Sequence, residues 1–312
     1  TNFYLVRDSY RNFVHTQTEI HGLQLLGTSL AITAALENWH DLMRINAVIG
    51  QGGATGQLEQ QIDTLQQHIN SQWQSLTLQQ GTNEQIAEFA SKREQLIKQL
   101  NAVGDESSLH SRAVLAGELL ASGVLFNRFI ASQTGLTQDT DLEVRQLMAL
   151  LTEVTPTVTQ SLGEGRAVAS LSLARGYLDS TNSNILDDLQ ISLDKLDAEY
   201  EMKLREALSS SDAAQQALNA LAQDSRATLQ EGLRVLEDKV IMADSMDLAW
   251  GDLYKEITAL VDKTHFFNNQ TVRYLNEQLS ERLVSYRLQM ILLIAALAAV
   301  FLLIGYLYSA FY

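Results

Sequence analysis

The sequence predicts an all-α protein: two stacked up-and-down helical bundles of the four-helix type, continuous with a C-terminal transmembrane helix. Three observations carry this prediction. Only 1 of the 312 residues is proline, which breaks helix interiors and usually makes up about 5% of a chain. Apolar residues recur at the three- and four-residue spacing of helices, without the alternation typical of strands. The run from Leu288 to Tyr312 contains no charged residue.

The uncharged run has the composition of a membrane span. About 20 consecutive apolar residues match the hydrocarbon thickness of a bilayer, roughly 30 Å. A buried core helix is the alternative, but core helices seldom run this long without a charge. Residues typical of the membrane–water interface precede the run and occupy its C-terminal end: Tyr286 and Arg287 come before it, and Tyr306, Tyr308, Phe311 and Tyr312 are its last aromatic residues. We therefore expect residues 288–312 to cross a membrane.

Residues 1–135 are predicted to form the first helical module. Its first helix covers residues 4–49 and ends in the glycine-rich segment 50–56, which we interpret as a helix hairpin turn. That segment lacks the Lys and Ser/Thr of a phosphate-binding loop and follows a helix instead of a strand. The second helix, with an apolar stripe over 58–76, ends at Gly81.

A capping-box spacing at Thr82 and Gln85 opens the predicted third helix. The fourth helix is expected over residues 107–132, and a polar linker follows it. Trp39 and Trp73, on the first and second helices, are interpreted as core or rim residues in preference to the lining of a pocket.

Residues 136–287 are predicted to form the second module. A second capping-box spacing at Thr140 and Glu143 opens its first helix, and Pro156 inside that helix is expected to kink it without ending it. Two more helices have stripes over 185–208 and 218–240. The last begins near Ser245 and meets no breaker before the uncharged run, so it is predicted to be one helix of about 100 Å.

Composition excludes several classes of function. A net charge of −15 argues against nucleic acid as a partner and against docking of the chain on anionic lipid. The absence of cysteine excludes disulfides, thiolate catalysis and cysteine-based metal sites. None of the six histidines has the H-E-x-x-H spacing, so no metal site is predicted. We expect no cofactor and no enzymatic activity.

His40 and four arginines are the candidate ligand-binding residues. Arg44 lies four residues after His40, on the same helix face, and a guanidinium binds a carboxylate through two parallel hydrogen bonds. Arg166 lies among small residues that leave space near a helix surface. Arg128 and Arg145 are weaker candidates. The alternative for His40 and Arg44 is an exposed or salt-bridged surface pair, and for Arg166 it is close packing with the guanidinium at the surface.

Several stretches resemble the extracytoplasmic sensor regions of bacterial methyl-accepting chemotaxis proteins, of the helical bimodular and nitrate-sensing types. The same sensor regions occur on some sensor kinases and diguanylate cyclases. The stretches that carry the resemblance are residues 19–23 (Glu-Ile-His-Gly-Leu), 36–50, 132–141, 156–176 and 305–312, the last of which is similar to the approach to a HAMP linker.

The resemblance implies a homodimeric receptor in the inner membrane whose sensor faces the periplasm and binds a small solute. A first membrane helix would precede Thr1, and HAMP and signalling domains would follow Tyr312. Many relatives carry His-Arg-Gly where this chain has His40-Asp41-Leu42. Because that arginine binds ligand in the nitrate sensors, the departure argues against nitrate and leaves a small organic anion as the favoured ligand.

Three hypotheses follow. The first is the sensing region of a chemoreceptor, which passes a conformational shift along the last helix into the membrane. The second attaches the same region to a sensor kinase or a diguanylate cyclase. The third, of a different class, is a membrane-tethered structural protein with a coiled-coil stalk, which would require sustained heptads that the interrupted stripes do not supply.

Overall fold

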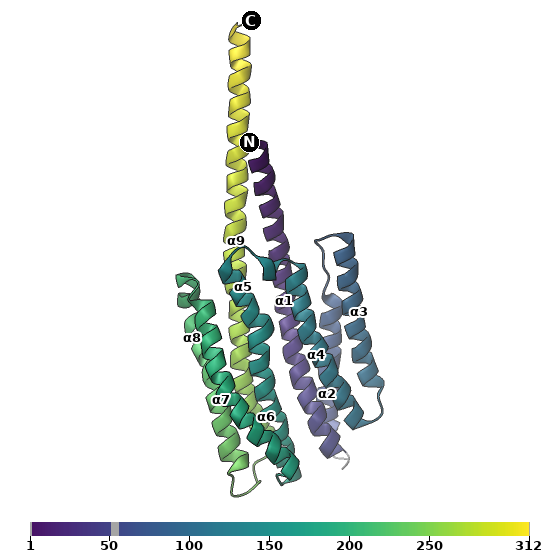
Figure 1. Ribbon diagram of the computed structural model, residues 1–312. Helices are drawn as coiled ribbons and strands as arrows, with labels where there is room; N and C mark the ends of the chain where they lie inside the picture. The colour runs from purple at the N-terminus through teal and green to yellow at the C-terminus, as the bar shows by residue number, and fades with distance from the viewer. Residues whose placement is uncertain (1, 51–55, 312) are drawn as a thin grey trace.

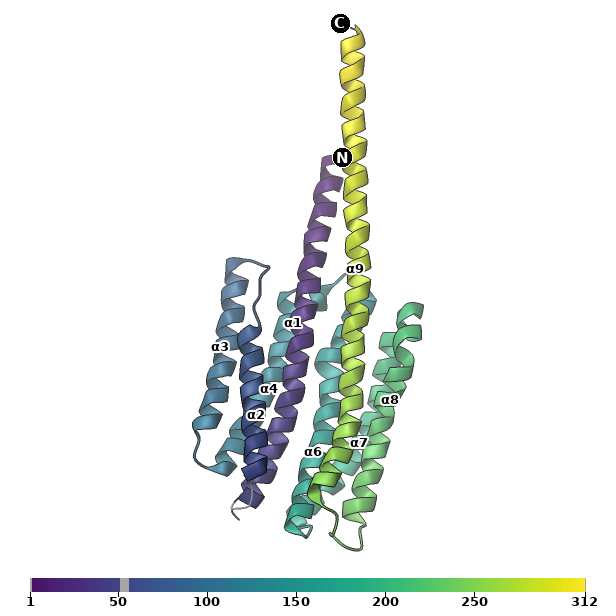
Figure 2. The ribbon, with the colours of Figure 1, turned by 180° about the vertical axis from the view of Figure 1, so that it is seen from behind.

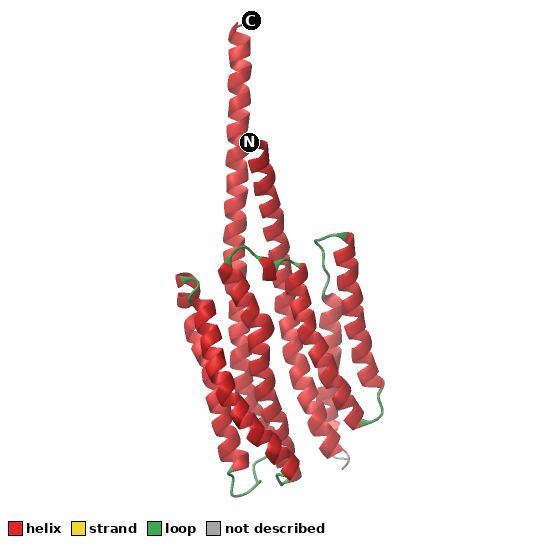
Figure 3. Cartoon of the chain, viewed as in Figure 1, coloured by secondary structure: helices red, strands yellow, loops and turns green. Residues whose placement is uncertain are grey.

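The computed structural model describes residues 2–50 and 56–311, and within these residues it contains helices and loops but no strand (Figure 3). The predicted all-α class is confirmed. The predicted hairpin turn at residues 50–56 lies largely outside the described residues. One group of helices comprises α1 (Asn2–Ile49), α2 (Gly56–Ser75), α3 (Asn83–Asp105) and α4 (Leu109–Gln133).

The second group follows the short 3₁₀ helix η2 (Leu136–Gln138) and contains two π-helical turns. Its elements are α5 (Leu142–Ala149), η3 (Leu150–Val154), α6 (Thr155–Arg175), α7 (Ser180–Leu208), α8 (Asp212–Leu236), η4 (Glu237–Ile241) and α9 (Trp250–Phe311). Gly135 connects α4 to η2 with a φ of 83°, a left-handed conformation that favours glycine.

The two bundles stack side by side, and α1 and α9 are the central pair (Figures 1 and 2). Helix α1 packs against α2 and α4 on one side and against α6 and α9 on the other, while α9 also packs against α6 and α8. The N-terminal part of α1 and the C-terminal part of α9 extend beyond the bundles at the same end (Figure 1). The interface between the bundles is therefore formed mainly by α1 with α6 and α9.

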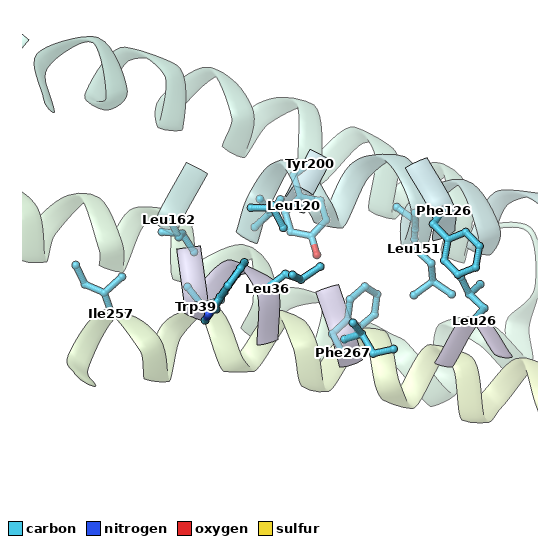
Figure 4. Packing of buried hydrophobic residues seen from close by; sticks show 14 of the residues in the cluster. Leu26, Leu36, Trp39, Leu120, Phe126, Leu151, Leu162, Tyr200, Ile257 and Phe267 are labelled. Atoms are coloured by element: carbon cyan, nitrogen blue, oxygen red, sulfur yellow. The ribbon is translucent and has the colours of Figure 1, made fainter. Parts of the chain in front are cut away.

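The core is apolar and runs through both bundles. Trp39 and Trp73 are 0% and 1% exposed, which confirms their interpretation as core residues. Figure 4 shows Leu36 and Trp39 of α1 in the same apolar layer as Ile257 and Phe267 of α9. Burial of large side chains such as these contributes about 1.5–3 kcal/mol each and holds the two helices in contact.

The two capping-box predictions had different outcomes. At Thr82 the box is present: its hydroxyl accepts from the Gln85 backbone N–H at 3.2 Å, and the Gln85 side chain accepts from the Thr82 N–H at 2.9 Å. At Thr140 the prediction was wrong. The N-cap is Asp141, whose carboxylate accepts from the Glu143 N–H at 3.0 Å, because a carboxylate at the next position satisfies the same free donor.

The predicted fifth helix is a continuous path through α5, η3 and α6. Pro156 lies in the first turn of α6, directly after the π-helical turn at Leu150–Val154. Proline has no backbone N–H and therefore needs no acceptor in the preceding turn. The π turn before it takes up one extra residue. The chain thus continues through the proline, as predicted.

Helix α9 is a single helix of 62 residues, about 90 Å long. It begins at Trp250 instead of near Ser245, because the carbonyl of Ala249 accepts the first helical hydrogen bonds, from Asp252 and Leu253. Within residues 2–50 and 56–311, two helices, α4 and α9, are long and apolar enough to cross a membrane. The apolar part of α4 is 44% buried in the bundle, whereas that of α9 is 0% buried. Helix α9 is therefore the candidate membrane span.

Gly22 marks a close approach of α1 to the end of α4, and we expect Gly22→Ala to destabilise the fold by about 1–3 kcal/mol. An added Cβ would lie 2.1 Å from the Thr134 hydroxyl oxygen and 2.3 Å from its Cβ. Chemical unfolding of the full chain in detergent, followed by tryptophan fluorescence, measures the change. Gly251→Ala is the control, since its Cβ would meet nothing within 4 Å and alanine favours a helix. Equal stability of the two variants would contradict the close approach.

Candidate functional site

Four ionisable residues of α1 share one helix face. Glu19, Glu37, Asp41 and Arg44 are separated by 18, 4 and 3 residues, which are close to whole numbers of helical turns. We call these four residues the α1 polar face. Its three carboxylates are between 1% and 4% exposed, and the face is directed at α6 and α9. Buried charges require partners, and each one has a partner on another helix.

The most enclosed contact is the ion pair between Asp41 and Arg166 of α6. The Arg166 Nε and Nη2 donate to the Asp41 Oδ2 at 2.9 and 2.7 Å, and Nη1 donates to the Thr258 hydroxyl of α9 at 2.9 Å. The guanidinium also lies over the Tyr254 ring, 4.7 Å from its centre. One side chain thereby connects α1, α6 and α9.

Arg166 is 2% exposed, so the surface position weighed for it from the sequence is wrong. The small residues around it let α1 approach: a Cβ at Gly163 would touch the Asp41 Oδ2 at 3.4 Å. Burial raises the pKa of Asp41 to about 6, although the Arg166 charge opposes that shift. The same carboxylate raises the pKa of Arg166, which remains charged although burial acts in the opposite direction.

Arg44 lies nearer the surface and pairs with Glu164 of α6. Its two terminal nitrogens donate to the two carboxylate oxygens at 2.5 and 3.1 Å, the two-point geometry characteristic of arginine and carboxylate. The side chains are 24% and 38% exposed, so the pair is accessible from solvent. This is the salt-bridged alternative weighed for Arg44, and it places a carboxylate where a ligand carboxylate would bind.

His40 occupies the side of α1 that faces α4. Its imidazole lies against Gly117, where a Cβ would be 3.0 Å from Nε2. Burial, with a smaller contribution from the Arg44 charge, lowers the pKa of His40 to about 4. The imidazole is therefore neutral at pH 7 and does not add positive charge next to Arg44.

Glu37 provides a second connection between α1 and α9. It accepts a hydrogen bond from the Thr159 hydroxyl of α6 at 2.7 Å and lies 3.1 Å from the His265 Nε2 of α9. One residue further along α1, Asn38 accepts from the Tyr254 hydroxyl. The α1 polar face is thus bonded to α6 and α9 over successive turns.

The third connection was not predicted from the sequence. Arg282 of α9 donates from Nη2 to Glu19 at 2.8 Å and binds both oxygens of Asp139 at 2.5 and 2.9 Å. We call these residues the Glu19–Asp139–Arg282 cluster. It lies just before the apolar run that begins at Leu288. A signal was present in the sequence, since Arg282 continues the apolar stripe of Leu275 and Leu279, but the two acids come from distant segments.

The two carboxyl groups of this cluster have opposite pKa shifts. Burial, reinforced by Asp139, raises the pKa of Glu19 to about 9. Burial alone would raise the pKa of Asp139 too, but hydrogen bonds from Arg282 and Glu19 hold it below its usual value. At pH 7 the cluster therefore contains one protonated carboxyl, one carboxylate and one guanidinium.

The weaker candidates Arg128 and Arg145 do not join the α1 polar face. The Arg128 Nε donates to the Thr152 carbonyl at 3.1 Å, and Arg145 donates to the Asp139 carbonyl. Across the described chain neither forms an ion pair.

Residues 2–50 and 56–311 also contain no group of three or more acids or histidines able to hold a metal ion.

Comparison with known proteins returned no relative. No protein family, curated protein or solved structure matches the chain.

Loss of the buried ion pair should be strongly destabilising. We expect Arg166→Met to lower the free energy of unfolding by about 3–5 kcal/mol, because it leaves Asp41 buried without its cation. Arg205→Met is the control: Arg205 forms an exposed pair with Glu201, worth at most about 1 kcal/mol. Tryptophan fluorescence in denaturant measures both variants. A loss in Arg166→Met no larger than in the control would show that Asp41 is solvated.

Glu19 should make stability depend on pH. Its pKa is about 9 in the folded protein against 4.5 for the free side chain, so the folded state retains a proton that the unfolded state releases. Its contribution is complete below pH 4.5 and is lost as the pH rises towards 9, by up to about 1.4 kcal/mol per pH unit.

Glu19→Gln cannot ionise, so the free energy of unfolding of this variant should fall less steeply with pH than that of the unmodified chain. Denaturant titrations at several pH values between 5 and 9 measure the slopes. Glu277→Gln, at an exposed position on α9, is the matched control and should keep the original slope. Identical slopes in all three proteins would rule out a titrating Glu19.

Proposed function

We propose that the chain is the extracytoplasmic sensing region of a transmembrane chemoreceptor, together with the membrane helix that follows it. The observation that carries this proposal is the continuity of α9. The same unbroken helix contains Thr258 and His265, which contact Arg166 and Glu37, and the apolar run from Leu288. A shift at the α1 polar face would thus be transmitted along a stiff element into the bilayer.

A small organic anion is the ligand that the site chemistry favours. A ligand carboxylate would replace Glu164 on the two terminal nitrogens of Arg44, the accessible pair, and would reproduce its two-point geometry. Asp41 and Arg166 lie next along the same interface. Movement of Glu164 shifts α6 against α1, and the Arg166 contact with Thr258 transmits that shift to α9.

The contacts between α1 and α9 have the properties of a switchable element. They are polar pairs embedded in an apolar layer, where a displaced partner leaves a buried polar group without a hydrogen bond. Arg128 and Arg145 bind backbone carbonyls and are left out of the proposed site. In this proposal the protein acts as a homodimer in the inner membrane, with the bundles in the periplasm. A receptor, a sensor kinase and a diguanylate cyclase would use this region in the same way.

Ligand binding should raise the thermal stability of the full chain in detergent. A ligand at 100 times its dissociation constant adds about 2.7 kcal/mol. Screening small organic acids, amino acids, nitrate and amines should give a shift for an organic anion, and Arg44→Gln should abolish it. Arg205→Gln, which removes an exposed arginine of α7, should leave the shift intact. A blank screen, or an undiminished shift in Arg44→Gln, would count against this site.

Transmission of the ligand-induced shift to α9 can be measured separately, by cross-linking α1 to α9. The chain has no cysteine, and a Cβ at Gly27 of α1 would lie 3.3 Å from Val272 of α9. A Gly27→Cys, Val272→Cys variant can therefore form a disulfide across the two helices. The ligand should change the rate of this cross-link. Binding without any change in rate would argue for a binding protein that does not signal through α9.

A further inference from the structure

The paired residues of α1 and α9 fix how the two helices are aligned. Glu19 pairs with Arg282 and Glu37 with His265, so the helices run antiparallel, nearly one residue for one residue. Continued towards the N-terminus, this register places Arg11 level with about residue 290 and Arg7 with about residue 294. Figures 1 and 2 show this part of α1 beside α9, beyond the bundles. The first turns of α1 thus lie beside the start of the apolar run.

The side chains of these turns are those typical of a membrane interface. Arg7 and Arg11 are exposed, and Arg7 lies over the Tyr4 ring at 5.3 Å from its centre. Exposed apolar and aromatic residues accompany them: Tyr4 at 65%, Leu5 at 50%, Tyr10 at 60% and Val14 at 39%. Aromatic rings and arginines with apolar stems are favoured at the headgroup level of a bilayer.

A groove opens at this level between three segments of the first bundle. It has a volume of about 1010 Å³ and is bounded by α1, by the loop between α2 and α3 with the first turn of α3, by the end of α4, and by η2. Arg7, Arg11 and His15 follow each other at intervals of four residues along its α1 wall. Gln80, Gln133 and Gln138 provide amide donors on the other walls.

The charge of the groove is opposite to that of the chain. Its lining contains two arginines, a histidine and no carboxylate, in a protein with 37 acidic residues and a net charge of −15. Among the described residues, Arg7 and Arg11 form no ion pair, while His15 lies 3.4 Å from Glu19. Two guanidiniums without a carboxylate partner, together with a wall rich in side-chain amides, suit a phosphate group.

We propose that this groove binds the headgroup of an anionic phospholipid from the leaflet that surrounds the base of α9. The inference rests on that part of the proposed function in which α9 crosses a bilayer. The phosphate would bind Arg7 and Arg11, and the acyl chains would lie along the apolar run of α9. The net charge of the chain argued against anionic lipid, but this local surface has the opposite sign. His15 joins the groove to Glu19, so a bound headgroup would compete with the Glu19–Asp139–Arg282 cluster.

Lipid retention by the full chain tests the proposal. The protein is inserted into nanodiscs that contain phosphatidylglycerol and phosphatidylcholine, extracted in mild detergent, and examined by native mass spectrometry. The unmodified chain should retain phosphatidylglycerol several-fold over phosphatidylcholine. Arg7→Gln, Arg11→Gln should lose this preference. The matched control is Arg205→Gln, Arg234→Gln, which removes two exposed arginines of the second bundle and should retain it.

The outcomes separate this proposal from the sensing function. If the chain inserts but all variants retain the two lipids equally, the lipid site is wrong and the sensing function is untouched. If the chain does not insert, α9 is no membrane span and both fail. If inorganic phosphate alone binds and displaces the lipid at millimolar concentration, the groove is a free-anion site and the lipid assignment is overturned. An unchanged thermal midpoint of the Arg7, Arg11 variant shows that it is folded.

Discussion

The ion pair between Asp41 and Arg166 is the contact on which the arrangement of the two bundles depends. Its carboxylate belongs to α1, its guanidinium to α6, and the remaining donor of that guanidinium reaches α9. Apolar packing specifies the register of neighbouring helices less strictly, because apolar side chains of similar volume can replace one another. A buried charge does not tolerate such a slide, because a displaced partner leaves it unpaired. The pair therefore fixes the register of three helices at one point.

Two further polar contacts repeat this arrangement along α1. Glu37 meets Thr159 and His265, and Glu19 meets Arg282 near the apolar run. Buried ion pairs contribute little net stability compared with apolar residues of similar volume, because desolvation offsets most of the attraction. Their value here lies in specifying position. Helices held by a few discrete polar contacts have a few discrete arrangements, which is the physical requirement for a two-state element.

The protonation states differ between the two ends of the α1 polar face. Towards the tips of the bundles, Asp41 keeps its charge at pH 7 because Arg166 compensates part of its burial. Towards the apolar run, burial, reinforced by the neighbouring Asp139, raises the pKa of Glu19 to about 9, so Glu19 retains its proton at pH 7. The Glu19–Asp139–Arg282 cluster thus contains a protonated carboxyl at pH 7, whereas the pair of Asp41 and Arg166 does not.

The sequence by itself determined the helical class, most helix limits and the long apolar helix. These are local properties: the spacing of apolar residues, the Thr82 cap and the absence of charge after Arg287 depend on neighbours a few residues apart. The sequence also identified Arg44 and Arg166 as candidate ligand-binding residues. Only the tertiary structure decided that Arg44 pairs with Glu164 and Arg166 with Asp41, since these partners are 120 and 125 residues away. The Glu19–Asp139–Arg282 cluster joins three distant segments, and helical periodicity carries no information on which faces meet.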